Sequence, residues 1–177
     1  MIILFEKFNN KPNVNSLSPE FWKMVRLVNW KGAIKFYNIN SIPVKYTQEK
    51  RDEYLLKMQG RLYLKYEYDE IENFNNEYYR FYMELYDYFF TIWTDDNYNN
   101  IMPSDDGYSD LISSIIGKGK NFTKKCIYDP IYYFVKMVKE NDYIENFGYL
   151  LNINFNEYID IKSKFDPFYG DVKKYNI

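Results

Sequence analysis

Three aspartates beside a glycine are the residues whose spacing comes closest to a reactive site. Asp105 and Asp106 precede Gly107, and Asp110 follows within one helical turn. Carboxylates grouped in this way can bind a hard cation, or can act as a general acid and a general base. The spacing does not fit a calcium loop, which needs ligands at alternating positions and a distal glutamate. We favour helix capping by Ser104 or Asp105, because adjacent acids in a first helical turn do not face one another.

A glycine- and lysine-containing run at residues 117–120 (GKGK) adds a cation shortly after these acids. It resembles part of a phosphate-binding loop, but it lacks the preceding strand-and-glycine frame and the Ser or Thr that follows the lysine. Helix termination by glycine, with lysines near the negative helix end, explains the run better. Lys118 therefore joins the three aspartates only in an alternative function, that of a metal- or ligand-dependent enzyme.

The chain contains no histidine. This removes the commonest general base near neutral pH and the commonest metal ligand, and it excludes Ser-His-Asp, Cys-His and His-based zinc chemistry. Cys126 follows two lysines that can lower the pKa of its thiol. A lone cysteine on an apolar helix face is more often packed and inert. We therefore assign no catalytic residue and no metal ligand, and we expect no cofactor.

Tyrosines interleaved with acids form the candidate binding surface. Six tyrosines are expected to be partly exposed: Tyr63, Tyr66, Tyr68, Tyr79, Tyr86 and Tyr88. The proposed partner contacts are Tyr63, Tyr66, Glu67, Glu70 and Tyr79. Tyrosine is enriched at interfaces, and acidic charge steers the encounter with a basic protein partner. A solvated helix face is the more ordinary interpretation of the same acids, and both interpretations stay open at this point.

The elements that must position these residues are predicted to be helices. Helical spacing and cap-and-proline starts indicate helices that begin near Ser18, Thr47, Asn75, Ser104, Asp129 and Asp142. Residues 75–93 carry one wide apolar stripe, which predicts a core helix. Residues 62–68 fit both a helix and the alternation of a strand, and we favour the helix. Residues 1–8 are typical of a short strand or extended edge.

The predicted fold is mainly α, a compact multi-helix single domain with a short N-terminal strand or extended segment. A chain of 177 residues has the length of one domain. We divide it into an N-terminal segment at 1–18, a helical domain at 19–151 and a C-terminal extension at 152–177. The extension is rich in Asn, Asp and Lys, and we expect it to form a loosely packed tail.

Composition restricts the compartment and the partners. A net charge of −2 and a pI near 5.3 argue against nucleic-acid binding. A single cysteine fits a reducing compartment, and the apolar start of the chain is too short for a signal peptide or a membrane span. We expect a soluble, cytoplasmic protein without membrane contact. Its abundant Asn, Lys, Ile, Tyr and Phe indicate an AT-rich genome, such as that of a low-GC bacterium or a phage.

Several features follow one another between residues 20 and 150. They are Phe21-Trp22, the apolar stripe that ends at Trp93, SDDGY at 104–108, an apolar stretch at 111–119 that ends in glycine, and Asp129-Pro130. This order resembles an uncharacterised bacterial family, domain-of-unknown-function family 4240. The resemblance implies a related fold but no established activity. The family usually has arginine and tryptophan where this chain has Ile112 and Ser114. If those positions serve a shared polar site, this chain has lost it.

These observations favour a binding protein over an enzyme. The chain is acidic, rich in tyrosine and without a catalytic constellation. We predict that it occupies the surface of a partner protein, as an inhibitor or an immunity-type protein does. The alternative is the enzyme that would use Asp105, Asp106 and Asp110. The sequence does not determine the oligomeric state.

Overall fold

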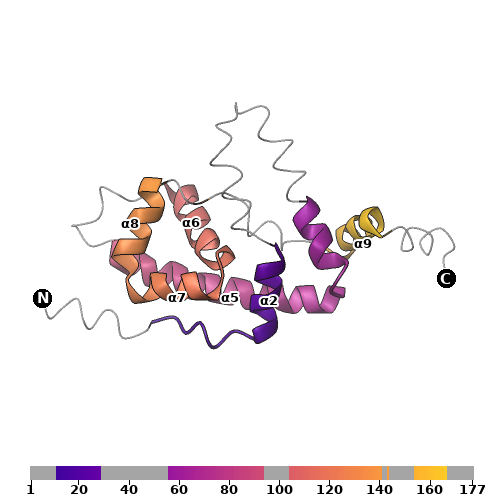
Figure 1. Cartoon of the computed structure of the whole chain (residues 1–177), viewed down its shortest axis with the longest axis horizontal. Helices are drawn as coiled ribbons and strands as arrows, with labels where there is room; N and C mark the ends of the chain where they lie inside the picture. The colour runs from indigo at the N-terminus through magenta and orange to yellow at the C-terminus, as the bar shows by residue number, and fades with distance from the viewer. Residues whose placement is uncertain (1–10, 29–55, 94–103, 141–142, 144–153, 167–177) are drawn as a thin grey trace, which may run out of the picture.

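The computed structural model describes residues 11–28, 56–93, 104–140, 143 and 154–166, and all regular structure within them is helical (Figure 1). Residues 56–63 are helical, and the other helices are α2 (Pro19–Val28), α5 (Tyr68–Trp93), α6 (Asp105–Gly117), α7 (Lys120–Tyr128), α8 (Pro130–Glu140) and α9 (Phe155–Phe165). The mainly α prediction is confirmed. The predicted strand at 1–8, the helix start near Thr47 and the helix from Asp142 lie outside the described residues.

Helix α5 is the longest described element, with 26 residues and a length of about 39 Å. Its apolar residues recur every three or four positions, so one face is buried along the whole helix. The buried residues of this face are Ile71, Phe74, Tyr78, Phe81, Leu85, Tyr88, Phe89 and Ile92. Figure 1 shows α6, α7 and α8 over one half of α5, and α9 beside residues 56–63 at the other end.

Helix α2 crosses the middle of α5 and is fixed there by polar and aromatic contacts. The Ser18 hydroxyl accepts a hydrogen bond from the Phe21 N–H at 3.0 Å, which confirms the predicted cap. Ser18 also donates its N–H and its hydroxyl to the Glu77 carboxylate of α5, at 3.0 and 2.7 Å. The Phe21 ring packs on Phe74, with centroids 4.9 Å apart. The start of α2 is thus tied directly to α5.

The ambiguous stretch at 62–68 is neither a strand nor an uninterrupted helix. The helix ends at Tyr63, a turn follows, and α5 begins at Tyr68, seven residues before its predicted start. The Tyr66 N–H donates to the Leu62 carbonyl at 2.9 Å within this turn. The Glu70 carboxylate accepts from the Glu67 N–H at 2.9 Å and satisfies a donor at the new helix start. The predicted continuous helix was therefore wrong beyond residue 63.

Helices α6, α7 and α8 follow one another with short connections. Gly119, with φ of +92°, stands between α6 and α7, in a backbone conformation that favours glycine. The Thr123 hydroxyl donates to the Ile115 carbonyl at 3.0 Å and links the two helices. The Asp129 carboxylate accepts from the Tyr132 N–H at 3.3 Å, which confirms the predicted cap of α8. The apolar side chains of α6 are buried.

The C-terminal residues 154–166 are packed, so the expectation of a loose tail was wrong there. Asn154 and Glu157 form a capping box that starts α9. Tyr158 is buried, and its ring lies 5.1 Å from the ring of Tyr63 between centroids. Helix α9 approaches the helix of residues 56–63 closely at Gly60. A Cβ atom at Gly60 would lie 2.6 Å from the Phe165 ring.

This close approach predicts that Gly60→Ala destabilises the protein by about 1–3 kcal/mol, the usual cost of overpacking. Helix propensity alone would give the opposite result, because alanine is favoured over glycine within a helix by about 1 kcal/mol. Urea unfolding of the full chain measures the change. In a Phe165→Ala background the same substitution should become neutral or stabilising. Stabilisation by Gly60→Ala with Phe165 intact would contradict the close packing.

Candidate functional site

The aspartate loop caps a helix, as expected. The Ser104 hydroxyl accepts a hydrogen bond from the Gly107 N–H at 3.3 Å, and Asp105 and Asp106 lie exposed in the first turn of α6. Carboxylates at this end of a helix stabilise it through the helix dipole. Within the described residues, no group of three or more Asp, Glu, Cys or His side chains could hold a metal ion.

Lys118 lies far from these aspartates. It is the C-cap of α6, so about 20 Å of helix separates it from Asp105 and about 12 Å from Asp110. Its side chain is buried, and its ammonium lies 4.7 Å from the centre of the Phe122 ring. The structure therefore does not bring together Asp105, Asp106, Asp110 and Lys118, the residues of the alternative enzyme site.

Cys126 is buried in the core. Burial raises the pKa of its thiol to about 12, and the nearby Lys118 only partly opposes that shift. A thiol that keeps its proton at neutral pH is a poor nucleophile. This agrees with the packed and inert role expected from the sequence.

Three tyrosines expected to be partly exposed are buried. Tyr63 is fully buried at the end of its helix, and Tyr66 is buried within the turn that follows. The Tyr66 hydroxyl donates to the Glu20 carboxylate at 2.6 Å, and the Tyr88 hydroxyl donates to the Ile127 carbonyl at 3.1 Å. The prediction was wrong because the turn at 64–67 reverses the chain, so that Tyr63 and Tyr66 both point into the core.

Glu67 and Glu70 are exposed, and each also makes a contact within the protein. The Glu70 carboxylate caps the start of α5, and the Glu67 carboxylate binds Lys162 of α9. Tyr79, at 41% exposure, is the one predicted tyrosine contact on the surface. It lies about 18 Å further along α5 than Glu67. The five predicted contact residues therefore do not form one surface.

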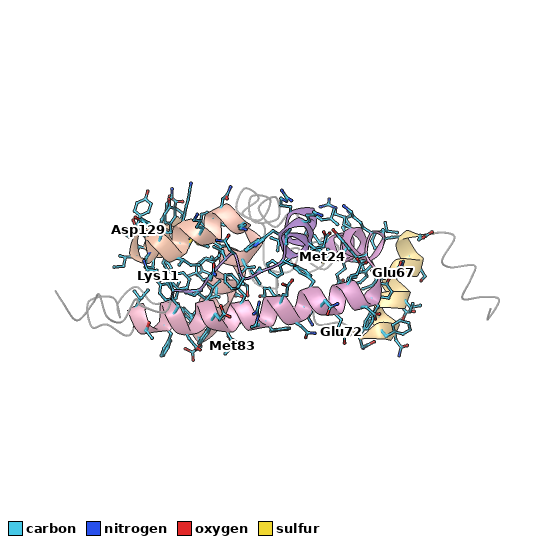
Figure 2. All side chains as sticks on the ribbon, turned by 90° about the horizontal axis from the view of Figure 1, so that it is seen from below. Lys11, Met24, Glu67, Glu72, Met83 and Asp129 are labelled. Atoms are coloured by element: carbon cyan, nitrogen blue, oxygen red, sulfur yellow. The ribbon has the colours of Figure 1, made fainter. Side chains whose placement is uncertain are left out.

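Lys162 is a polar contact that sequence reasoning missed. The side chain is buried, and its ammonium donates to both carboxylate oxygens of Glu67 at 3.1 Å and to the Tyr158 hydroxyl at 2.6 Å. The Tyr158 hydroxyl in turn donates to the Tyr66 carbonyl at 3.2 Å. These bonds attach α9 to the turn before α5. Figure 2 shows Glu67 beside α9. The only signal in the sequence was the four-residue spacing of Tyr158 and Lys162, which puts both on one helix face.

A row of exposed apolar side chains runs along α5, and we name it the α5 strip. It consists of Tyr79, Tyr82, Met83, Tyr86 and Phe90. Tyr79, Met83 and Phe90 are 41%, 52% and 43% exposed, and the other two are half-buried. Met83 points away from the other described helices (Figure 2). Sequence reasoning expected Tyr79 and Tyr86 to be partly exposed, but it did not join them with Met83 and Phe90 into one surface of this helix.

The rings of the α5 strip hold one another in place. Tyr82 and Tyr86 lie 6.0 Å apart between centroids, and Tyr86 stacks on Phe90 at 6.2 Å with an interplanar angle of 9°. The edge of Tyr86 also meets Tyr108 of α6 at 4.7 Å. Buried Tyr108 donates its hydroxyl to the Tyr86 carbonyl at 2.8 Å. The strip is therefore a surface ordered by the core beneath it.

Charged side chains of both signs flank the α5 strip. Asp87 and Arg80 are exposed on α5 beside it, four and three residues from Met83, and Glu84 lies further round the helix. Asp110 of α6 lies near the opposite edge. Burial raises the pKa of Tyr82, and the Asp110 carboxylate adds to that shift. The strip is thus bordered by two acids, Asp87 and Asp110, and by one base, Arg80.

No family model, curated protein or solved structure matches the chain. The resemblance to family 4240 therefore stays a prediction. Ile112 and Ser114, the two departures from that family's pattern, are both fully buried in α6. Among the described helices, none is both long enough and apolar enough to span a bilayer.

The contacts of Lys162 predict that Lys162→Met lowers the free energy of unfolding by about 1–3 kcal/mol, because Tyr158 and Glu67 lose a charged donor. Methionine keeps most of the apolar stem, so the change isolates the ammonium. Lys164→Met, on the exposed face of the same helix, is the matched control and should change stability by less than about 0.5 kcal/mol. Equal effects of the two changes in urea unfolding would show that the contact contributes nothing.

Buried tyrosines predict a loss of stability at alkaline pH. Burial raises the pKa of Tyr88 to about 12, and burial with the Glu20 hydrogen bond does the same for Tyr66. A folded pKa above the unfolded value of about 10 contributes stability that is complete below pH 10. That contribution is lost as pH rises towards 12.

The measurement is the free energy of unfolding between pH 9 and pH 12. The free energy of unfolding of the Tyr88→Phe variant should fall less steeply with pH than that of the wild type over this range. At neutral pH the variant lacks the hydrogen bond of the Tyr88 hydroxyl. Tyr128→Phe, at a ring that is 82% exposed, is the matched control. An unchanged slope for Tyr88→Phe would contradict the assignment.

Proposed function

We propose that the protein binds another protein through the α5 strip and acts by occupying that partner's surface, as an inhibitor or an immunity-type protein does. The observation that carries the proposal is an ordered row of exposed aromatic and methionine side chains along α5. Rows of exposed large apolar side chains on a folded protein typically mark interaction sites. The α5 strip replaces the surface predicted from Tyr63, Tyr66, Glu67, Glu70 and Tyr79, of which only Tyr79 is retained.

The side chains of the strip are suited to protein contact. Tyrosine supplies a large, rigid apolar area and a hydroxyl, while methionine adapts to an irregular partner surface. Tyr82, Tyr86 and Phe90 already stack on one another. Little side-chain freedom then remains to be lost when a partner packs on the strip. These properties support binding to a protein surface.

The charge of the chain supports a basic partner. The net charge is −2, and Asp87 and Asp110 border the strip against one base, Arg80, so positive side chains would be attracted and the rate of encounter raised. The same charge opposes the phosphate backbone of a nucleic acid, so the proposal does not include nucleic-acid binding. It does include a cytoplasmic location, which the single cysteine supports. Membership of family 4240 is part of the proposal too, and it rests on the sequence features alone.

The test compares a truncated strip with an equally drastic change elsewhere. Met83→Ala combined with Phe90→Ala should weaken binding to a partner captured from the source cells at least tenfold, as loss of central apolar contacts typically does. Tyr128→Ala, at the most exposed of the described large apolar side chains, is the control and should bind like the wild type. Biolayer interferometry with the purified partner measures both.

Asp87→Lys should slow association and reduce its dependence on salt, because it reverses a charge that attracts the partner. Asp87→Lys and Tyr128→Ala should keep the wild-type free energy of unfolding to within about 0.5 kcal/mol, because these side chains are exposed. Met83→Ala with Phe90→Ala loses the stacking of Phe90 on Tyr86, so its unfolding curve is measured to show that the variant is folded under the conditions of the binding assay. Equal affinities of the strip variant and the Tyr128→Ala control would refute the proposed surface.

A further inference from the structure

The α5 strip contains a line of side chains whose spacing is complementary to itself. Its members follow one another at intervals of four, three and four residues: Tyr79, Met83, Tyr86 and Phe90. These intervals are the alternation of the two apolar positions in a heptad repeat, which keeps the line on one side of a helix. Because the intervals are the same from either end, a second α5 that runs in the opposite direction presents the same line. Tyr79 then lies opposite Phe90 of the second copy, and Met83 lies opposite Tyr86 of the second copy.

The two charges beside this line are also complementary in that arrangement. Arg80 and Asp87 are exposed and lie seven residues apart, on the same side of the line. In an antiparallel pair of identical helices, this side of both helices lies at the same edge of the interface. Arg80 of each copy therefore stands opposite Asp87 of the other, and the ion pair forms twice. In a parallel pair, the same side would lie opposite the Tyr82 side of the second helix, and the charges would not meet.

We propose that, when no other partner is bound, a second copy of the chain covers the α5 strip, with the two α5 helices packed antiparallel about a two-fold axis near residue 84. A two-fold interface uses the same patch of both chains, so the patch must be complementary to itself in shape and in charge. The α5 strip meets both conditions. Met83 points away from the other described helices, so a second helix can approach from that side (Figure 2). Displacement of the second copy by a partner protein rests on the proposed function, whereas the dimer does not.

The acids of α5 do not oppose this arrangement. Three of its six acids stand near its start: Asp69, Glu70 and Glu72. In the paired stretch, residue 76 lies opposite Trp93 at the end of the second α5, so these three acids lie beyond that helix. Glu77 is bound to the cap of α2, and Glu84 lies further round the helix than Asp87. Asp87 is therefore the acid of α5 that meets the second copy.

The size and order of the strip indicate a weak dimer. The strip covers about 16 Å of helix from Tyr79 to Phe90, and interfaces that bury less than about 1,200 Å² are typical of transient pairs. Tyr86 is already held by Phe90 and by Tyr108, so little side-chain freedom is lost on pairing. Repulsion between two chains of net charge −2 is screened beyond about 8 Å at physiological salt. A dimer of this kind can release its surface to a partner that binds more tightly.

The first test is sedimentation equilibrium of the full chain from low micromolar to millimolar concentration. We expect a monomer and a dimer in exchange, with a dissociation constant in the micromolar range. Met83→Ala combined with Phe90→Ala should weaken the dimer at least about tenfold, and Tyr128→Ala, at an exposed ring on α7, should leave it unchanged. A monomer at every concentration would overturn the inference. A dimer that does not respond to the strip variant would also overturn it.

The second test exchanges the two charges. Arg80→Asp and Asp87→Arg should each weaken the dimer at least about tenfold, because either change turns both ion pairs into like-charge contacts. The two changes in one chain should restore it. An equimolar mixture of the two single variants should form a heterodimer, although neither variant dimerises alone. The changed side chains are exposed, and urea unfolding of each variant checks that it is folded. No recovery in the double variant or in the mixture would overturn the antiparallel arrangement.

A competition experiment tests the displacement with the partner captured from the source cells. Adding this partner to the dimer should give complexes of one chain with one partner in sedimentation velocity, because both occupants need the α5 strip. A complex that keeps two chains together would overturn the displacement. The two proposals fail separately. A monomeric chain whose partner depends on the strip would overturn the dimer and leave the proposed function standing. A dimer whose partner binds independently of the strip would overturn the proposed function and the displacement, but not the dimer.

Discussion

Burial of one face of α5 is the constraint on which the described structure depends. A helix of 26 residues with an apolar residue at every third or fourth position cannot leave that face in water, because each large side chain contributes about 1.5–3 kcal/mol when buried. Helices α2 and α6 pack on it, and α7 and α8 pack in sequence beyond α6. The position of each of these helices follows from covering part of the same face.

Polar contacts determine where the helices sit on this face. Glu77 binds the cap of α2, and Tyr78 donates its hydroxyl to Ser113 of α6 at 3.0 Å. At the opposite end, Lys162 attaches α9 to the turn that precedes α5. Apolar packing alone tolerates sliding and rotation, whereas each of these bonds is lost if a helix moves by one residue. They give the apolar core a defined register.

The same helix carries the surface that we propose for partner binding. Because the core fixes the rings of Tyr86 and Tyr108 from one side, the exposed strip on the other side is ordered as well. Asp87 beside it stays in solvent and adds charge without a cost of burial. In the proposed function, the core helix and the binding helix are therefore one element, whose two faces have different roles.

The sequence alone determined the helical class, the caps at Ser18, Ser104 and Asp129, and the absence of histidine chemistry, because caps and periodicity act over a few neighbouring residues. Tertiary structure decided which tyrosines are buried and which charged side chains contact one another. Tyr63 and Tyr66 face the core because the chain turns at 64–67, and Lys162 meets Glu67 from 95 residues away. Local pattern carries no information about such distant contacts, since they arise only when packed helices bring separate segments together.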